Sequence, residues 1–295
     1  MQPAMCAEGR VALVTGASQG GTGTAIAVRL AAEGARVAVT ARSRDGLDAT
    51  VTRINALGGP EAVAFPADLS RPDGGRDDLV DEVERRLGPI DILVNNAAMG
   101  GYKPFEEWTD RELALITNVN VWSPWTLMRA AVPGMRSRGE GWVLNLTSFA
   151  AELPPGPPFP TNRPATAGSA YGSTKAALNR LTLSVAAETA GDGIAANALT
   201  PQAAIATPQL LAAGWVDRAY MEPLETIAEA ALALCTGTIT GRIAYSLQLL
   251  VELDRPVRHL DGVGLVPDWQ PADLPAVIAT HTARLEAAGW TNPFA

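Results

Sequence analysis

Cysteine and histidine are scarce in this sequence, with two of each in 295 residues. Cys6 and Cys235 lie far apart in the chain, which is unlike the closely spaced cysteines of a disulfide-stapled domain or a zinc site. We therefore expect no disulfide framework and no bound metal. Free thiols are also what a reducing cytoplasm favours.

Long apolar runs and excess positive charge are missing too. No apolar stretch approaches the roughly 18 residues of a membrane-spanning helix, and residues 1–10 contain no apolar signal-peptide core. A net charge of −8 argues against a nucleic-acid binder. The 47% hydrophobic and 18% charged residues predict a soluble cytoplasmic protein, with one large α/β domain or two small ones.

Lysine is the rarest basic residue: of 23 basic side chains only Lys103 and Lys175 are lysines. Lys175 lies in a stretch from Ser169 to Leu183 whose apolar spacing predicts a buried helix. Tyr171 and Lys175 are four residues apart, so they share one face of that helix. An ammonium near a phenol lowers the phenol pKa, which makes Tyr171 a candidate proton donor or acceptor. The alternative is a surface tyrosine and lysine that only happen to share a helix.

A glycine-rich loop near the N-terminus has the context of a dinucleotide site. The apolar run Arg10–Thr15 predicts a buried strand, residues 16–23 carry four glycines, and Thr24–Glu33 has a helical pattern. Glycines at such a turn allow the backbone to approach a pyrophosphate at the helix N-terminus. The alternative for a glycine cluster alone is a simple turn.

The rest of the chain alternates between strand and helix patterns, which is typical of βαβ units and a parallel sheet. We expect further strands at Arg36–Arg42, Ala62–Asp68, Asp91–Ala98, Gly141–Ser148, Gly193–Pro201 and Ile243–Val251. We expect further helices at Asp45–Leu57, Asp77–Leu87, Arg111–Arg136, Leu224–Cys235 and Leu274–Ala288. These elements predict an α/β fold with a seven-stranded, mostly parallel sheet and helices on both faces.

From about Arg10 to about Leu253 the sequence resembles the short-chain dehydrogenase/reductase superfamily. The motifs that carry this resemblance are the glycine loop, Asp68, Asn95-Asn-Ala-Ala98, Asn120, Ser148 and Tyr171-x-x-x-Lys175. Their order and spacing together are very specific. The resemblance implies a doubly wound Rossmann fold in residues 1–253, with residues 254–295 as a C-terminal extension packed on the same domain.

The resemblance also implies roles for four catalytic residues. Tyr171 would be the general acid/base, and Lys175 would lower its pKa and hold the nicotinamide ribose. Ser148 would orient the substrate oxygen; Thr147 competes for this role, but strand alternation sends its side chain to the other face. Asn120 would bend its helix and complete a proton relay, although it could simply cap or kink the helix.

The implied cofactor is NADP. By resemblance its contacts come from the glycine loop, the ends of the strands and the catalytic helix: Gly16, Ser18, Gln19, Gly21, Thr22, Gly23, Arg42, Ser43, Asp68, Leu69, Asn96, Ala97, Tyr171, Lys175, Pro201, Ile205 and Thr207. An NAD enzyme normally has an acidic residue at the end of the second strand. Arg42 and Ser43 stand there instead, with Arg44 next, and suit a 2′-phosphate.

The sequence departs from the family pattern in five places, of which one is small: the Asn-Asn-Ala-Gly motif ends here in Ala98. The glycine loop is one residue longer, which leaves open whether Gly20 or Gly21 approaches the pyrophosphate. The 23 residues from Ser148 to Tyr171 include an extra proline-rich loop, Leu153–Pro164, expected beside the active-site mouth. Gln202 replaces a glycine after Pro201. The tail beyond residue 253 contains His259 and His281, which we interpret as structural.

We therefore predict hydride transfer between NADP(H) and a carbonyl compound or secondary alcohol. Apolar residues in Thr207–Glu222, where the family carries a substrate-covering lid, suggest a hydrophobic substrate. Alternatives are a non-catalytic NADP-binding protein, or a related Rossmann enzyme that reduces C=C bonds or acts as an epimerase. A homodimer or homotetramer through the two long helices, Arg111–Arg136 and Ser169–Ala190, is typical of the family.

Overall fold

The computed structural model describes residues 5–18, 20–154, 156–157, 159, 168–214 and 216–287. Its centre is a seven-stranded sheet in the order β3-β2-β1-β4-β5-β6-β9, and every pairing in it is parallel. The strands are β1 (Val11–Thr15), β2 (Arg36–Ala41), β3 (Ala62–Pro66), β4 (Ile92–Asn95), β5 (Gly141–Leu146), β6 (Ile194–Thr200) and β9 (Ile243–Tyr245). The predicted parallel sheet is confirmed.

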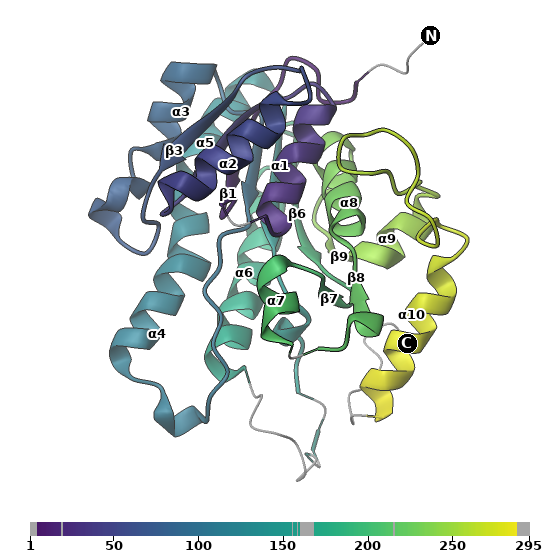
Figure 1. The fold of residues 1–295 in the computed structure, drawn as a ribbon. Helices are drawn as coiled ribbons and strands as arrows, with labels where there is room; N and C mark the ends of the chain where they lie inside the picture. Colours follow the sequence, from purple (N-terminus) through teal and green to yellow (C-terminus); the bar gives the residue numbers. More distant parts are fainter. Residues whose placement is uncertain are drawn as a thin grey trace.

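Helices cover both faces of this sheet, because its strands are apolar on both sides (Figure 1). In β1, Ala12 and Val14 belong to one core cluster, whereas Val11 and Leu13 belong to the other. The first cluster includes residues of α1 (Thr22–Ala32), α2 (Arg44–Asn55), α8 (Leu224–Thr236) and α9 (Ser246–Glu252). The second includes residues of α3 (Leu79–Leu87), α5 (Ser123–Arg138) and α6 (Ser169–Glu188). The Rossmann-like architecture follows from this double covering.

The long helix expected at Arg111–Arg136 is interrupted. It consists of α4 (Asp110–Thr117), a π-helical turn at Asn118–Trp122, and α5. Thr109 and Glu112 form a capping box that starts α4, and Gly139 ends α5 in a left-handed conformation. The buried Asn120 lies inside the π-helical turn. A widened turn at that point displaces the helix, as the resemblance implies for this asparagine.

The expected strand Ile243–Val251 is wrong beyond its third residue. The strand β9 ends at Tyr245, and Ser246 begins the helix α9. The buried residues of this segment are Ser246, Leu247, Leu249 and Leu250, which together form one face of a helix and not the strict alternation of a strand. The apolar run was too short for its period to distinguish the two.

The segment expected as a lid contains α7 (Pro208–Ala213) and a short two-stranded parallel sheet of β7 (Ala204–Ile205) and β8 (Met221–Glu222). Glu222 is completely buried and anchors this segment to the main domain. Its carboxyl group accepts a bond from the backbone N–H of Ala203 at 3.1 Å and lies 2.8 Å from the Ser246 hydroxyl. Burial raises the pKa of Glu222 to about 7.

Hydrogen counting around Glu222 agrees with a neutral carboxyl group. The Thr226 hydroxyl lies 2.6 Å from Oε2 of Glu222 and 2.8 Å from the carbonyl oxygen of Pro223. A hydroxyl carries only one hydrogen, so it cannot donate to both oxygens. Both contacts are satisfied when Thr226 donates to Pro223 and a protonated Glu222 donates to Thr226.

The tail beyond residue 253 packs on the first core cluster, to which it contributes the buried Val257, Leu260 and Leu274. A buried ion-pair network joins it to two core helices: Glu229 of α8 accepts from Arg29 of α1 at 2.7 Å and from Arg255 of the tail at 2.8 Å. The tail ends in α10 (Leu274–Ala287), which lies beside α9 (Figure 1).

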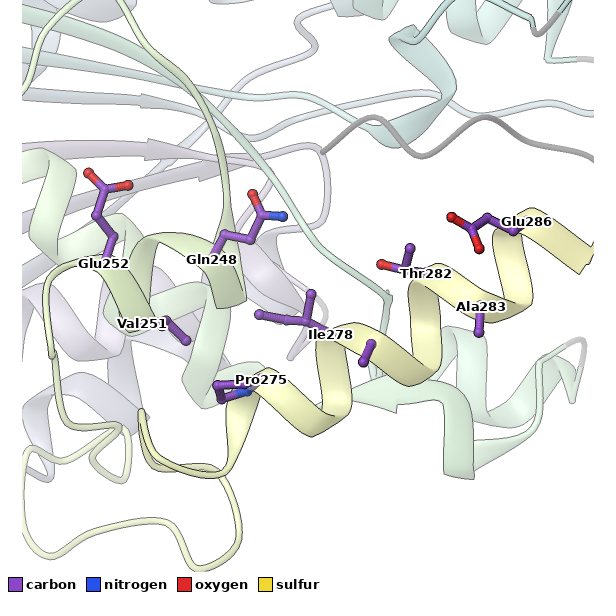
Figure 2. Close-up of a pocket in the computed structure, with 9 residues that line it drawn as sticks. Gln248, Val251, Glu252, Pro275, Ile278, Thr282, Ala283 and Glu286 are labelled. Atoms are coloured by element: carbon purple, nitrogen blue, oxygen red, sulfur yellow. The ribbon is translucent and has the colours of Figure 1, made fainter. Parts of the chain in front are cut away.

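A cavity of about 560 Å³ lies between α9 and α10 (Figure 2). Gln248 and Glu252 line it from α9, and Ile278, Thr282 and Glu286 line it from α10. None of the residues predicted to act in catalysis or cofactor binding lines this cavity. His281, expected to be structural, is buried, and its burial lowers its pKa; His259 is exposed.

Within the described ranges, no helix is long and apolar enough to cross a membrane. The same residues include no group of three or more histidine, cysteine, aspartate or glutamate side chains that could hold a metal ion.

The Glu222→Gln substitution is expected to stabilise the protein increasingly as the pH rises from 5 to 8. The pKa of Glu222 in the folded protein, about 7, lies above the usual value of 4.5. The protonated carboxyl group therefore makes its full contribution to the free energy of unfolding below pH 4.5, and this contribution is lost as the pH rises through 7. Glutamine stays neutral, so the gain at pH 8 relative to pH 5 should reach about 1–3 kcal/mol. Urea unfolding at both pH values measures it. The exposed Glu188→Gln is the control, and an equal gain at both pH values would contradict an ionisable buried Glu222.

Candidate active site

The glycine loop ends in a helix N-terminus that no side chain of the described residues caps. Gly16 and Gly20 have positive φ angles of 70° and 69°, which favour glycine, and Gly21 is the N-cap of α1. Glycine has no side chain that could accept hydrogen bonds from the first N–H groups of α1. The first turn of α1 also contains no acidic residue. These free N–H groups and the helix dipole suit an anionic ligand. Ser18 and Thr22 flank the loop, and Gln19 lies outside the described residues.

Asn96 and Ala97, directly after β4, hydrogen-bond the start of the glycine loop. Nδ2 of Asn96 donates to the carbonyl oxygen of Thr15 at 2.8 Å, and the N–H of Ala97 donates to the Thr15 hydroxyl at 2.9 Å. A Cβ on Gly23 would lie 2.6 Å from the carbonyl oxygen of Gly16 and would overlap Asn96. Glycine at position 23 is therefore required for the packing of α1 on the sheet.

The end of β2 presents an unpaired arginine. Arg42 is exposed, and among the described residues its side chain makes no hydrogen bond or ion pair. Ser43 caps α2 by accepting from the N–H of Gly46 at 3.2 Å, and Arg44 pairs with Asp48 at 3.1 Å. The guanidinium of Arg42 is thus available to a ligand, whereas that of Arg44 is already engaged.

Asp68 follows β3 and lies in the electrostatic field of Arg42. Partial burial alone would raise the pKa of Asp68. Hydrogen bonds from Ser70, whose hydroxyl donates to Oδ1 of Asp68 at 2.7 Å, outweigh this effect, so the pKa of Asp68 is lowered. Leu69 beside it is buried in the core. Asp68 is therefore an ionised acceptor at the edge of the site.

The helix α6 brings Tyr171 and Lys175 to the carboxyl end of β5. Lys175 is 2% exposed, and its ammonium donates to the carbonyl oxygen of Leu146 at 2.7 Å. This ammonium lies 5.7 Å from the centroid of the Tyr171 ring. Burial lowers the pKa of Lys175 to about 8. In the described part of the chain the ammonium has one protein acceptor, so two of its three N–H groups remain for a ligand.

The expected lowering of the Tyr171 pKa by Lys175 is absent from the protein alone. Burial raises the pKa of Tyr171 to about 12, the nearby Tyr102 raises it further, and only a hydrogen bond with Ser148 lowers it. The reason is geometric, because the ammonium of Lys175 is directed to the strand carbonyl of Leu146 and lies over the ring. Spacing on the helix placed these two residues on one face but did not give the direction of the ammonium.

Ser148 and Thr147 separate as strand alternation predicts. Ser148 hydrogen-bonds the side chain of Tyr171, and its hydroxyl also accepts from the N–H of Ala150 at 3.2 Å. The Thr147 hydroxyl is buried and lies 3.5 Å from the carbonyl oxygen of Lys175. Ser148 is therefore the hydroxyl that faces the phenol of Tyr171.

Among the described residues, the side chain of Asn120 makes no hydrogen bond with Lys175. Its Oδ1 accepts from the N–H of Met99 at 2.8 Å, and its Nδ2 donates to the carbonyl oxygen of Met99 at 2.9 Å and to the Thr174 hydroxyl at 3.0 Å. Thr174 in turn donates to the carbonyl oxygen of Tyr171 at 2.8 Å. The side chain thus connects the loop after β4 to the helix that carries Tyr171.

The segment after β6 lies beside the glycine loop. Thr207 caps α7 by accepting from the N–H of Leu210 at 3.2 Å, and a Cβ on Gly21 would lie 3.6 Å from Thr207 Cγ2. Ile205 is buried in β7, next to the loop that begins at Pro201. Gln202, where the family has glycine, is buried, and its side-chain amide has no partner in the described part of the chain.

Two expected features fall partly outside the described residues. The proline-rich loop Leu153–Pro164 is described only at 153–154, 156–157 and 159, where Leu153 and Phe159 are exposed. Trp215, expected in the lid, also lies outside the described residues.

Sequence reasoning missed Tyr102, whose ring meets that of Tyr171 edge-on at 5.9 Å between centroids. The available signal was an aromatic residue directly after two glycines, just beyond the carboxyl end of β4. Ligands bind outside the carboxyl ends of parallel strands, so an aromatic residue there is a candidate wall of the site.

The fold and site are those of a Rossmann-type enzyme with a tyrosine, a lysine and a serine at the carboxyl edge of its sheet. Residues 10–210 match the short chain dehydrogenase family. A fatty acyl-CoA reductase of Mycobacterium tuberculosis is 33% identical over 273 residues, which cover 91% of this chain and 84% of that protein. The chain belongs to the short-chain dehydrogenase family and is an oxidoreductase of that class.

Solved structures resemble this fold over most of its length. A 3-oxoacyl (acyl-carrier-protein) reductase from Agrobacterium tumefaciens with NADP bound has a TM-score of 0.71 and 30% identity, covering 82% of this chain and 94% of that one. A putative short-chain alcohol dehydrogenase from Sinorhizobium meliloti has a TM-score of 0.71 and 29% identity, covering 83% and 97%.

Two substitutions in the glycine loop separate its structural role from its binding role. Gly23→Ala should destabilise the protein by several kcal/mol, because its Cβ overlaps Asn96 and the Gly16 carbonyl. Gly21→Ala should fold normally, since its Cβ meets only ordinary contacts at 3.6–3.8 Å, yet weaken NADPH binding at least tenfold. Thermal unfolding and fluorescence titration measure the two effects. An unaltered NADPH affinity in Gly21→Ala would show that the pyrophosphate does not approach this residue.

Proposed function

We propose that the protein transfers hydride between NADP(H) and the carbonyl carbon of an apolar aldehyde or ketone, or the corresponding alcohol. The observation that carries this proposal is the meeting of Ser148, Tyr171 and the buried Lys175 at the carboxyl edge of the sheet. The glycine loop and its uncapped helix lie at the same edge. The nicotinamide of the bound cofactor supplies or accepts the hydride.

The protein's own residues fit such a cofactor. The free N–H groups of α1 suit its pyrophosphate, and the two remaining N–H groups of Lys175 suit hydroxyl groups of a ribose. Arg42 offers an unengaged guanidinium for a 2′-phosphate. Support from known proteins comes from the NADP in the Agrobacterium structure.

In carbonyl reduction, Tyr171 donates its proton to the substrate oxygen while Ser148 holds that oxygen in place. A phenol with a pKa of about 12 remains protonated at neutral pH and is ready to donate. In the reverse direction the phenolate must form, which requires positive charge close to its oxygen. The Lys175 ammonium has two N–H groups free to participate in that stabilisation. Asn120 does not exchange a proton in this scheme. It holds Met99 and the start of α6 in place through its hydrogen bonds to Met99 and Thr174.

The chemistry of the related proteins supports an acyl-type or other apolar carbonyl substrate. The Mycobacterium relative is described as a fatty acyl-CoA reductase, and the Agrobacterium structure as a 3-oxoacyl carrier-protein reductase. Both names describe reductases of acyl compounds. Exposed apolar side chains that agree with this class are Tyr102 beside Tyr171, and Leu211 in α7.

A homo-oligomer through α5 and α6 is part of this proposal. Trp122 and Trp125 expose 49% and 47% of their surfaces, and their rings pack edge-on at 6.2 Å. A groove of about 590 Å³ runs between these two helices. Exposed tryptophans beside an apolar groove are typical of an interface, and a second copy of the chain offers the matching face.

Tyr171→Phe is expected to lower kcat for ketone reduction by at least about 100-fold and to leave the Kd of NADPH nearly unchanged. It removes only the hydroxyl group that donates the proton, and general acid catalysis contributes roughly 10²–10⁴-fold. NADPH oxidation at saturating cofactor measures kcat. Tyr220→Phe, in a tyrosine that stacks on Arg284, is the matched control. A Tyr171→Phe enzyme within tenfold of wild type would rule out Tyr171 as the acid.

Arg42→Ala is expected to remove most of a 10- to 100-fold preference for NADPH over NADH in kcat/KM. A hydrogen bond to a charged group contributes roughly 1.5–3 kcal/mol, and about 1.4 kcal/mol is tenfold. Efficiency with NADH should change little. Arg44→Ala, which breaks a pair with Asp48, is the control and should leave the preference intact. Wild-type efficiency that is equal or better with NADH would contradict the proposed role of Arg42.

A further inference from the structure

The loop after β4 is fixed at two points close to the catalytic tyrosine. At its start, both the N–H and the carbonyl of Met99 bond the buried Asn120, at 2.8 and 2.9 Å. At its end, the ammonium of Lys103 bonds Glu112 at 2.6 Å and lies 4.8 Å from the ring centroid of Trp108. Only residues 100–102 separate the two attachments.

These attachments leave little freedom to the intervening residues. A Cβ on Gly101 would lie 2.5 Å from Cη2 of Trp108, so the backbone packs directly on that ring. Gly100 has no neighbour within contact distance of a Cβ. Tyr102 is therefore the side chain that this loop presents at the site.

The ring of Tyr102 is in contact with the site on one side and open on the other. It meets Tyr171 at an interplanar angle of 61°, and its Cε1 lies 3.6 Å from the Cβ position of Gly168 at the start of α6. Even so, 55% of Tyr102 is exposed. The Gly168 position is also 3.9 Å from the methyl group of Ala150. The ring of Tyr102 thus packs against the ring of Tyr171 and the start of α6.

An aromatic ring held in place but half uncovered is a surface on which an apolar group can pack without ordering a flexible side chain. Its position beside Tyr171 places that surface next to the atom that would donate the proton. Flat groups gain most from such a contact, because aromatic pairs add attraction beyond the area they bury. The charge of Lys103 does not compete, since Glu112 neutralises it.

We propose that Tyr102 is a specificity-determining residue that packs against a flat, apolar substituent on the carbonyl carbon of the substrate. This inference rests on the proposed carbonyl reduction and deepens it, because it selects aryl and other unsaturated ketones over small aliphatic ones. Asn120 is a positioning residue for this wall, through its two bonds to Met99.

The test compares acetophenone with butanone, using NADPH oxidation by the wild type, Tyr102→Phe and Tyr102→Ala. Tyr102→Ala should lower kcat/KM for acetophenone about tenfold, chiefly through a higher KM, and change the value for butanone less than twofold. Tyr102→Phe keeps the ring and should restore both values to within about twofold of wild type. The exposure of Tyr102 allows both variants to fold, and unchanged NADPH affinity verifies this.

Three results would overturn the inference. A Tyr102→Ala enzyme with unchanged acetophenone kinetics, or with equal losses for both ketones in kcat alone, would remove Tyr102 as a specificity residue and leave carbonyl reduction intact. A Tyr102→Phe enzyme as impaired as Tyr102→Ala would assign the effect to the hydroxyl group. A wild type that oxidises NADPH with neither ketone would remove the proposed reaction and this inference together.

Discussion

A fully buried ammonium is the interaction on which the site depends. Lys175 is held under Tyr171 by the carbonyl of Leu146, at the last residue of β5. Removing a charge from water is costly unless partners compensate. The ammonium of Lys175 must therefore stay within hydrogen-bond distance of the Leu146 carbonyl, which requires α6 to lie at one fixed height over the sheet. A polar ladder sets that height: Asn95 donates to Asn145, which donates to Thr182 of α6, both at 2.8 Å. Close packing of Gly172 on the carbonyl of Ala150 fixes the other end.

The candidate catalytic groups are parts of one contact between α6 and the end of β5. Ser148 comes from the strand end, whereas Tyr171 and Lys175 come from the helix. Asn120 reaches the same helix through Thr174. The packing that buries Lys175 therefore also sets the distance between the two hydroxyl groups that would handle the substrate oxygen.

The sheet and its helices were predictable because βαβ units leave strong local patterns: apolar runs, turn glycines and helical spacing. The predicted strand Ile243–Val251 was wrong in its second part, where the seven residues of α9 form a helix. Leucines in this segment are spaced both two and three residues apart, so the sequence fits the period of a strand as well as that of a helix. The partners of Glu222 and the direction of the Lys175 ammonium were not predictable, since both depend on groups far away in sequence. The place of Tyr102 after two glycines and β4 was a signal that it could line the site, but its contact with Tyr171 depends on a residue far away in sequence.

The buried pair of Arg29 and Glu229 has a consequence for the order of synthesis. Arg29 has one acidic partner nearby in the chain, Glu33 at 2.7 Å, but the carboxylate that bonds its Nε, that of Glu229, is 200 residues further on. At about 5–20 residues per second, a ribosome needs roughly 10–40 s to supply that partner, and Arg255 arrives later still. Until then Glu33 alone balances the guanidinium, and the face of α1 that packs on α8 has no cover. That face of α1 therefore stays exposed, and vulnerable to aggregation, until the carboxyl-terminal helices have emerged.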